Sequence, residues 1–145
     1  MLSRNKPWES YRKVATQTAT PGQLVLMLYD GAIKFLEKAL TGFEYDDPLM
    51  FNQTINNNVL RAQAIIHEMN ATLNMEAGGE VSSNFRRLYN YLYRRLTVAN
   101  RTKQKAPVQE VISRVRELRD SWAEMLRRGA EARQTDDSSL TEVAA

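Results

Sequence analysis

PVQEVISRVRELRDSWAEM, at residues 107–125, is the stretch of sequence that decides the fold. Its apolar residues recur at alternating steps of three and four, at Val108, Val111, Val115, Leu118, Trp122 and Met125. This spacing puts them on one face of an α-helix that Pro107 opens, and such a face has to pack against other elements. The stretch therefore predicts one helix of a multi-helix bundle.

A second strong helix signal lies upstream, at residues 20–23. Thr20 offers a capping hydroxyl, Pro21 suits the first turn, and Gln23 occupies the capping-box position, so a helix is predicted to begin there. Gly31 in its middle costs helix stability, which suggests a close crossing with another backbone. The apolar face of this helix includes Leu24, Leu28, Ala32, Phe35 and Ala39.

Two more helices are predicted between these. Asp47 and Pro48 begin one whose stripe is Phe51, Ile55, Val59, Ala62, Ile66, Met69 and Leu73. It is predicted to end near Gly78 and Gly79, because glycine supplies the left-handed conformation that closes a helix. The next helix carries Val81, Phe85, Leu88, Leu92, Leu96 and Ala99, and a polar linker at 101–105 follows it. Short connections favour antiparallel neighbours, so the predicted fold is an all-α, antiparallel up-down four-helix bundle over residues 20–129.

The two flanking segments differ in character. Residues 1–19 contain Trp8, Tyr11 and Val14 at a three-residue spacing, which predicts a short amphipathic segment that seeks a groove. It either caps the open end of the bundle or forms a detachable flap over a partner site, and the sequence leaves both interpretations open. Residues 130–145 lack helical periodicity, and we expect a disordered acidic tail.

Composition limits the class of protein. The chain has 145 residues, 43% hydrophobic and 26% charged, with no cysteine, which fits a single cytoplasmic domain without disulfides. No apolar run is long enough to span a bilayer and the amino terminus does not read as a secretory signal, so no membrane insertion is expected. The net charge is +3; residues 131–145 contribute −3, leaving about +6 on the rest.

The sequence offers little for catalysis. His67 is the only histidine, and no carboxylate lies three or four residues from it on its helix face. No P-loop, glycine-rich dinucleotide turn or nucleophile elbow occurs. We therefore expect no enzyme activity, no metal and no cofactor.

Nucleic-acid binding is a weaker alternative. Arg86, Arg87, Arg94 and Arg95 share one side of the third predicted helix, and tyrosines lie between them. However, the charge is modest and no helix-turn-helix pattern occurs, so we expect no nucleic acid as a partner.

Several motifs, read in order, are similar to those of a known family. They are Thr18-Ala19-Thr20-Pro21, Leu28-Tyr29-Asp30-Gly31-Ala32-Ile33, Leu73-Asn74 with Gly78-Gly79-Glu80, Leu88-Tyr89-Asn90-Tyr91, Arg94-Arg95-Leu96, Ala99-Asn100 and Leu118-Arg119-Asp120-Ser121-Trp122. In this order and spacing they resemble the flagellar secretion chaperone family, FliS, and the resemblance covers roughly residues 11–126. The resemblance implies a four-helix bundle that binds the carboxy-terminal segment of flagellin, prevents its premature polymerisation and delivers it to a component of the flagellar export gate. It also implies that the segment around Tyr11 covers part of the groove when no client is bound.

Candidate client-binding residues lie just outside each core stripe, where a wide apolar face meets the surface. They are Leu60, Ile65, Tyr89, Tyr93, Ile112 and Leu126. Each is equally well explained as a widened core position. A helical adaptor for another protein client remains an alternative function, and the sequence leaves open whether the chain is a monomer or a homodimer.

Overall fold

The computed structural model describes residues 20–144, and side chains as far as residue 136. This part of the chain folds into four helices: α2 (Pro21–Gly42), α3 (Pro48–Ala71), α4 (Met75–Thr102) and α5 (Lys105–Ala144). No strand occurs among the described residues, which confirms the predicted all-α class. The predicted amino-terminal segment with Trp8, Tyr11 and Val14 lies outside the described residues.

Helix starts follow the predicted capping chemistry. Thr20 Oγ1 accepts a hydrogen bond from the Gln23 amide at 3.2 Å, and Gln23 Oε1 accepts one from the Thr20 amide at 3.1 Å, completing a capping box. Asp47 accepts from the Met50 amide at 3.3 Å. Both predicted starts are confirmed.

The predicted end of the second helix is wrong. Helix α3 ends at Ala71, and Asn74 caps α4 by accepting a hydrogen bond from the Ala77 amide at 3.0 Å. Gly79 has φ +53°, so its left-handed backbone makes a kink inside α4 and not a turn between helices. The asparagine cap, which starts the helix before the two glycines, is the signal that decides this boundary.

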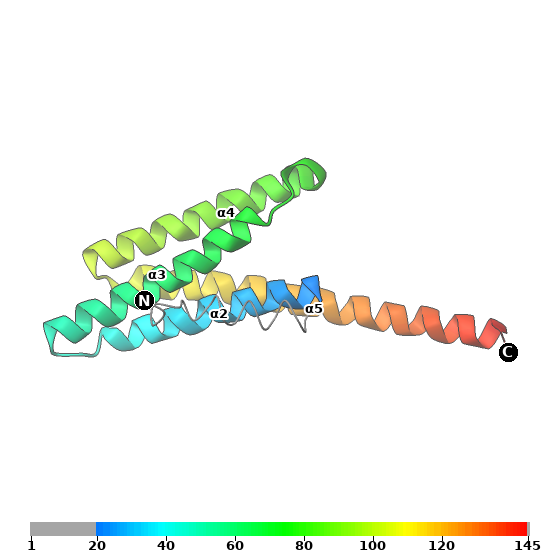
Figure 1. Cartoon of the computed structure of the whole chain (residues 1–145), viewed down its shortest axis with the longest axis horizontal. Coiled ribbons are helices and arrows are strands. Elements are labelled where there is room, and N and C mark those ends of the chain that lie inside the picture. The colour runs from blue at the N-terminus through cyan, green and yellow to red at the C-terminus, as the bar shows by residue number, and fades with distance from the viewer. Residues whose placement is uncertain (1–19, 145) are drawn as a thin grey trace, which may run out of the picture.

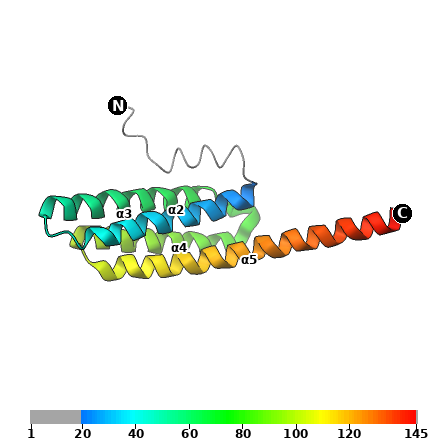
Figure 2. The ribbon, with the colours of Figure 1, turned by 90° about the horizontal axis from the view of Figure 1, so that it is seen from below.

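The helices form an antiparallel ring in which each contacts two neighbours. Helix α2 packs against α3 and α5, and α4 also packs against α3 and α5 (Figures 1 and 2). The connections are short, at 43–47, 72–74 and 103–104. At the end where α3 leads into α4, the α3–α4 pair diverges from α2 and α5 (Figure 1).

The core is built on the four predicted stripes, but two residues of the stripes are exposed. Residues of all four stripes are buried, including Phe35, Ile55, Ile66, Leu92, Leu96, Val108, Val111 and Val115. Val81 and Met125 were expected on the stripes but are 63% and 51% exposed. Both lie toward the diverging end, where the helices separate and leave the apolar residues of the stripes without a neighbouring helix.

Polar contacts connect neighbouring helices along the outside of the bundle. Arg119 Nε lies 2.8 Å from Asp30 Oδ1 between α5 and α2, and Arg95 Nε lies 2.8 Å from Glu110 Oε1 between α4 and α5. Hydrogen bonds from Tyr91 and then Arg95 hold the pKa of Glu110 below its ordinary value. Such exposed pairs fix the register more than they stabilise the fold.

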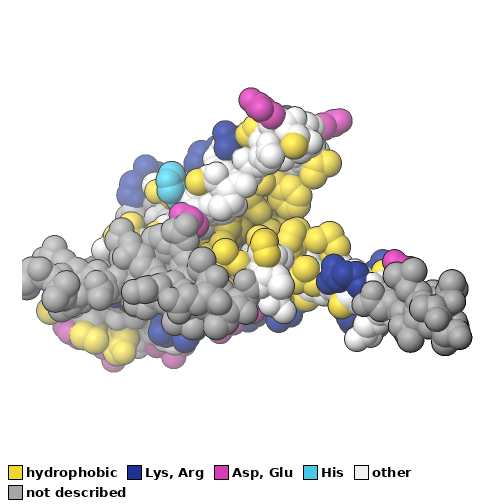
Figure 3. All heavy atoms as spheres, turned by 45° about the vertical axis from the view of Figure 1, so that its right-hand side comes forward, with side chains coloured by type: hydrophobic (Ala, Val, Ile, Leu, Met, Phe, Trp, Pro, Cys, Tyr) yellow, Lys and Arg dark blue, Asp and Glu magenta, His cyan; other side chains and the backbone are white. Residues whose placement is uncertain are grey.

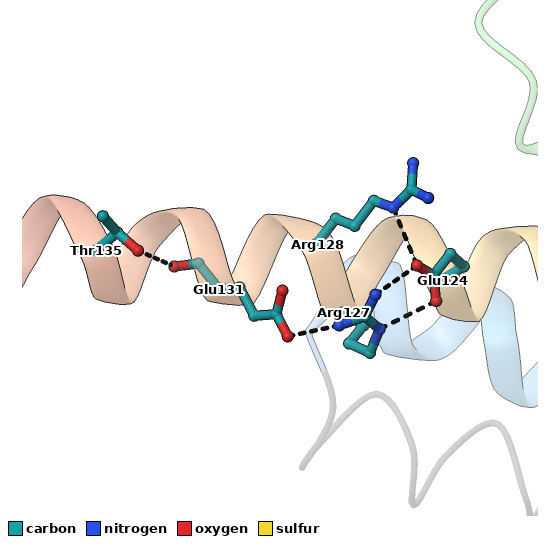
Figure 4. Close-up of polar contacts among 5 residues, drawn as sticks. All are labelled: Glu124, Arg127, Arg128, Glu131 and Thr135. Atoms are coloured by element: carbon teal, nitrogen blue, oxygen red, sulfur yellow. Dashed lines mark hydrogen bonds and ion pairs between the residues drawn. The ribbon is translucent and has the colours of Figure 1, made fainter.

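Helix α5 differs from the prediction at its carboxy-terminal end. We expected the helix to end near residue 129 and a disordered tail to follow, but α5 continues to Ala144 and projects beyond the bundle (Figure 2). Residues 130–136 are all exposed. Glu124 pairs with Arg127 and Arg128, and Arg127 also pairs with Glu131, at helical spacing (Figure 4). Such pairs and good helix formers sustain a helix without an apolar stripe.

No helix in the described part of the chain is long and apolar enough to cross a membrane.

Candidate binding cleft

An apolar cleft of about 200 Å³ opens at the diverging end of the bundle. All four helices or their ends contribute to its lining, which consists of Val25, Leu28, Tyr29, Met69, Thr72, Leu73, Asn74, Phe85, Tyr89 and Trp122. Figure 3 shows hydrophobic side chains gathered in the hollow between the two diverging arms. The cleft exists because the helix pairs separate here while their apolar stripes continue.

Two tyrosines close the inner side of the cleft. Tyr29 of α2 and Tyr89 of α4 are 2% and 4% exposed, and their hydroxyl oxygens lie 2.8 Å apart. The ring of Phe85 packs against that of Tyr89 with centroids 5.8 Å apart. Burial raises the pKa of both tyrosines above the ordinary value, so both hydroxyls stay protonated at neutral pH.

Trp122 fixes the α5 side of the cleft to the first turn of α2. Its indole Nε1 donates a hydrogen bond to the Gly22 carbonyl at 2.7 Å. Leu126, one turn further along α5, packs against the same turn, since a Cβ added at Gly22 would come within 2.6 Å of Leu126 Cδ2. The start of α2 therefore lies at the rim of the cleft.

A second hollow, of about 330 Å³, lies on the face between α3 and α4. Its lining consists of Ile66, His67, Asn70, Tyr89, Asn90, Tyr93 and Arg94. Asn70 Nδ2 donates to Asn90 Oδ1 at 2.9 Å across this face. Because Tyr89 lines both hollows, they adjoin at this residue.

The six predicted client-binding residues do not form one surface. Tyr89 lines the cleft and the second hollow, Tyr93 lines the second hollow and is 41% exposed, and Leu126 borders the rim. Leu60 is 51% exposed on α3. Ile65 and Ile112 belong to the buried core, which agrees with the alternative explanation that they are widened core positions. Client contact stays a prediction for all six.

Sequence reasoning missed most of the cleft. Leu73, Phe85 and Trp122 are only partly buried, yet their spacing assigned them to the core. No local sequence signal marks this end, because large side chains such as Phe35 and Phe51 lie elsewhere on the stripes. Helical periodicity shows which face is apolar but not where two helices separate.

The residues considered for a metal site or a basic face form no metal site in the described part of the chain, and most of the arginines have partners within the bundle. Among residues 20–136, no three histidines, cysteines or carboxylates come together as a metal site. Arg86 donates to Asn70 at 3.3 Å, Arg87 donates to Asn84, and Arg95 pairs with Glu110. Three of the four arginines that suggested a basic face are thus engaged within the bundle.

An antiparallel bundle with an apolar cleft at one end defines a helical binding module, of the kind that receives amphipathic segments of other proteins. The family model described as flagellar protein FliS matches residues 4–129. The flagellar secretion chaperone FliS of Bacillus subtilis is 38% identical over 125 residues, covering 86% of this chain and 90% of its own. Those of Escherichia coli and Salmonella typhimurium are 31% and 30% identical, each covering 77% of this chain and 80% of their own.

The chain therefore belongs to the FliS family of flagellar secretion chaperones. The resemblance inferred from the ordered motifs is confirmed.

Proposed function

We propose that this protein is a cytoplasmic export chaperone that binds the carboxy-terminal segment of flagellin. It prevents premature polymerisation of flagellin and passes it to a component of the flagellar export gate. The observation that carries the proposal is the open apolar cleft at one end of a bundle that belongs to the flagellar chaperone family. Binding and release are its whole activity, without catalysis or a cofactor.

The size of the cleft sets how the client binds. A volume of about 200 Å³ holds a few side chains and not a folded domain. The client is therefore an extended or helical segment that places a few apolar anchors in the cleft and continues over the outer faces of the bundle. Tyr93 and Leu60, both exposed, are the predicted contacts along that path. Ordering the client on binding offsets part of the contact energy, which keeps the complex releasable at the export gate.

We also propose that residues 1–19 form a flap that occupies the cleft before the client arrives. Trp8, Tyr11 and Val14 supply apolar anchors of the type that the cleft accepts. The position of the chain supports this, because Thr20 precedes the first turn of α2, whose Gly22 carbonyl lies at the rim beside Trp122. The flap then competes with the client for one apolar surface.

Co-elution with flagellin tests the function. We expect the protein and its cognate full-length flagellin to form a stable complex in size-exclusion chromatography at micromolar concentration. Flagellin lacking its last few dozen residues is the matched control and should elute alone. Separate elution of the two full-length proteins would refute the proposal.

A parallel capture experiment tests for other partners. Capture of a different protein from the source organism's lysate, with flagellin absent, would identify an adaptor for another client. Nucleic-acid binding is disfavoured because Arg86, Arg87 and Arg95 are engaged within the bundle. Retention of nucleic acid that falls steeply with salt would contradict that view.

A further inference from the structure

Two tyrosines that line the cleft share a buried hydrogen bond between their hydroxyl groups. Tyr29 and Tyr89 come from α2 and α4, which are not neighbours in the ring of helices. Both residues line the cleft, both are more than nine-tenths buried, and their oxygens lie 2.8 Å apart. A polar pair in this position needs an explanation beyond packing, because phenylalanine would fill the same space.

The pair holds one more donor than it uses. Each phenol has one O–H and two lone pairs, and only one of the two protons can lie between the oxygens. Among residues 20–136, the hydrogen bond between the two tyrosines is the only one that either hydroxyl makes, so the other proton has no acceptor there. The nearby polar groups are engaged elsewhere, since Thr72 Oγ1 donates to the Met69 carbonyl at 2.7 Å and Asn74 Oδ1 accepts from the Ala77 amide at 3.0 Å.

We propose that the Tyr29–Tyr89 pair is a polar anchor that donates a hydrogen bond to an uncharged backbone carbonyl of the client segment in the cleft. The inference rests on the proposed function and adds the chemistry by which the cleft recognises its occupant. A ligand that supplies an acceptor for the free proton should bind with higher affinity than a ligand that brings only apolar side chains.

The surroundings favour a carbonyl over a carboxylate. None of the ten residues that line the cleft is lysine or arginine, so a carboxylate would lose its hydration there without a compensating charge. Within a helix, backbone carbonyls are already bonded, but those of the last turn and of non-helical stretches are free. The client therefore enters the cleft with the carboxy-terminal end of a helix or with an unwound stretch.

Removing both hydroxyls gives the sharpest test. Tyr29→Phe alone or Tyr89→Phe alone leaves one buried hydroxyl without its partner and should lower stability, whereas the double variant removes both and should regain it. The double variant should nevertheless bind the carboxy-terminal flagellin segment about tenfold more weakly by calorimetry, the loss expected for one hydrogen bond. Tyr45→Phe, 44% exposed in the loop between α2 and α3, is the control and should bind as the native protein does.

The outcomes separate the anchor from the function. Native affinity in the double variant, with the native protein binding the segment, would overturn the anchor and leave the proposed function intact. Failure of the native protein itself to bind would overturn both.

A second measurement applies if the double variant loses its helical signal. In the native protein, NMR should detect one slowly exchanging tyrosine hydroxyl proton in the free state and two in the complex with the segment. A single protected proton in the complex would overturn the anchor.

Discussion

Gly42 controls how closely α2 and α3 approach each other. A Cβ at this position would lie 2.9 Å from Ile55 Cγ1 and 3.1 Å from the Ile55 backbone nitrogen, and backbone has little room to move. At Gly31, where the sequence suggested a close crossing, an added Cβ would meet only the flexible end of the Ile65 side chain at 3.2 Å. The close approach of α2 to α3 is therefore at Gly42, at the end of α2, and not at Gly31 in its middle.

Gly42→Ala should lower the free energy of unfolding by about 2 kcal/mol, because the overpacked contact separates the helices. Gly129→Ala is the matched control, since its added Cβ would have only the end of Arg133 within reach, at 3.9 Å. That variant should be at least as stable as the native protein because alanine favours the helix. Urea denaturation followed by circular dichroism measures both, and native stability of Gly42→Ala would contradict the account.

Among the contacts of single residues, only those between near neighbours in the sequence could be predicted. The capping box of Thr20 and Gln23 and the cap at Asp47 involve atoms three residues apart, so the sequence alone determines them. The Tyr29–Tyr89 and Trp122–Gly22 hydrogen bonds join residues 60 and 100 positions apart. Nothing in local spacing indicates such a pair.

At the scale of elements, the helices were predictable but two of their ends were not. Asn74 is one of several asparagines in its region, and two glycines a few residues later gave the stronger stop signal. The extension of α5 was missed because the prediction required an apolar stripe. In the structure the ladder of Glu124, Arg127 and Glu131 takes the place of the stripe (Figure 4).

The amino-terminal segment is the element whose role is easiest to test. Replacing Trp8 and Tyr11 with alanine should raise the association rate of the flagellin segment severalfold in stopped-flow measurements, because a closed flap reduces the fraction of competent protein. The matched control replaces Asn5 and Ser10, polar residues of the same segment, and should leave the rate unchanged. An unchanged rate with native stability in the Trp8 and Tyr11 variant would rule out the flap, and a loss of stability would assign the segment to capping the bundle.

At the scale of the whole molecule, the proposed function depends on a geometric feature that periodicity does not encode. The stripes predicted an up-down bundle and the ordered motifs indicated the family, and both are confirmed. The cleft arises because the α3–α4 pair diverges from α2 and α5, which leaves partly buried residues such as Leu73 and Phe85 at the open end. Sequence reasoning placed them in the core because it assigned each stripe a packing partner along its full length.

The central claim is that flagellin binds at this open end, and the affinity of a cleft variant tests it most directly. Leu73 lines the cleft, whereas Leu49, 61% exposed, lies at the start of α3 at the opposite end of the bundle. Calorimetry with the carboxy-terminal flagellin segment should show at least about tenfold weaker binding for Leu73→Asp, because the client would bury an unpaired charge. Leu49→Asp should bind as the native protein does, and circular dichroism should show both variants fully helical. Native affinity in a folded Leu73→Asp variant would contradict the account.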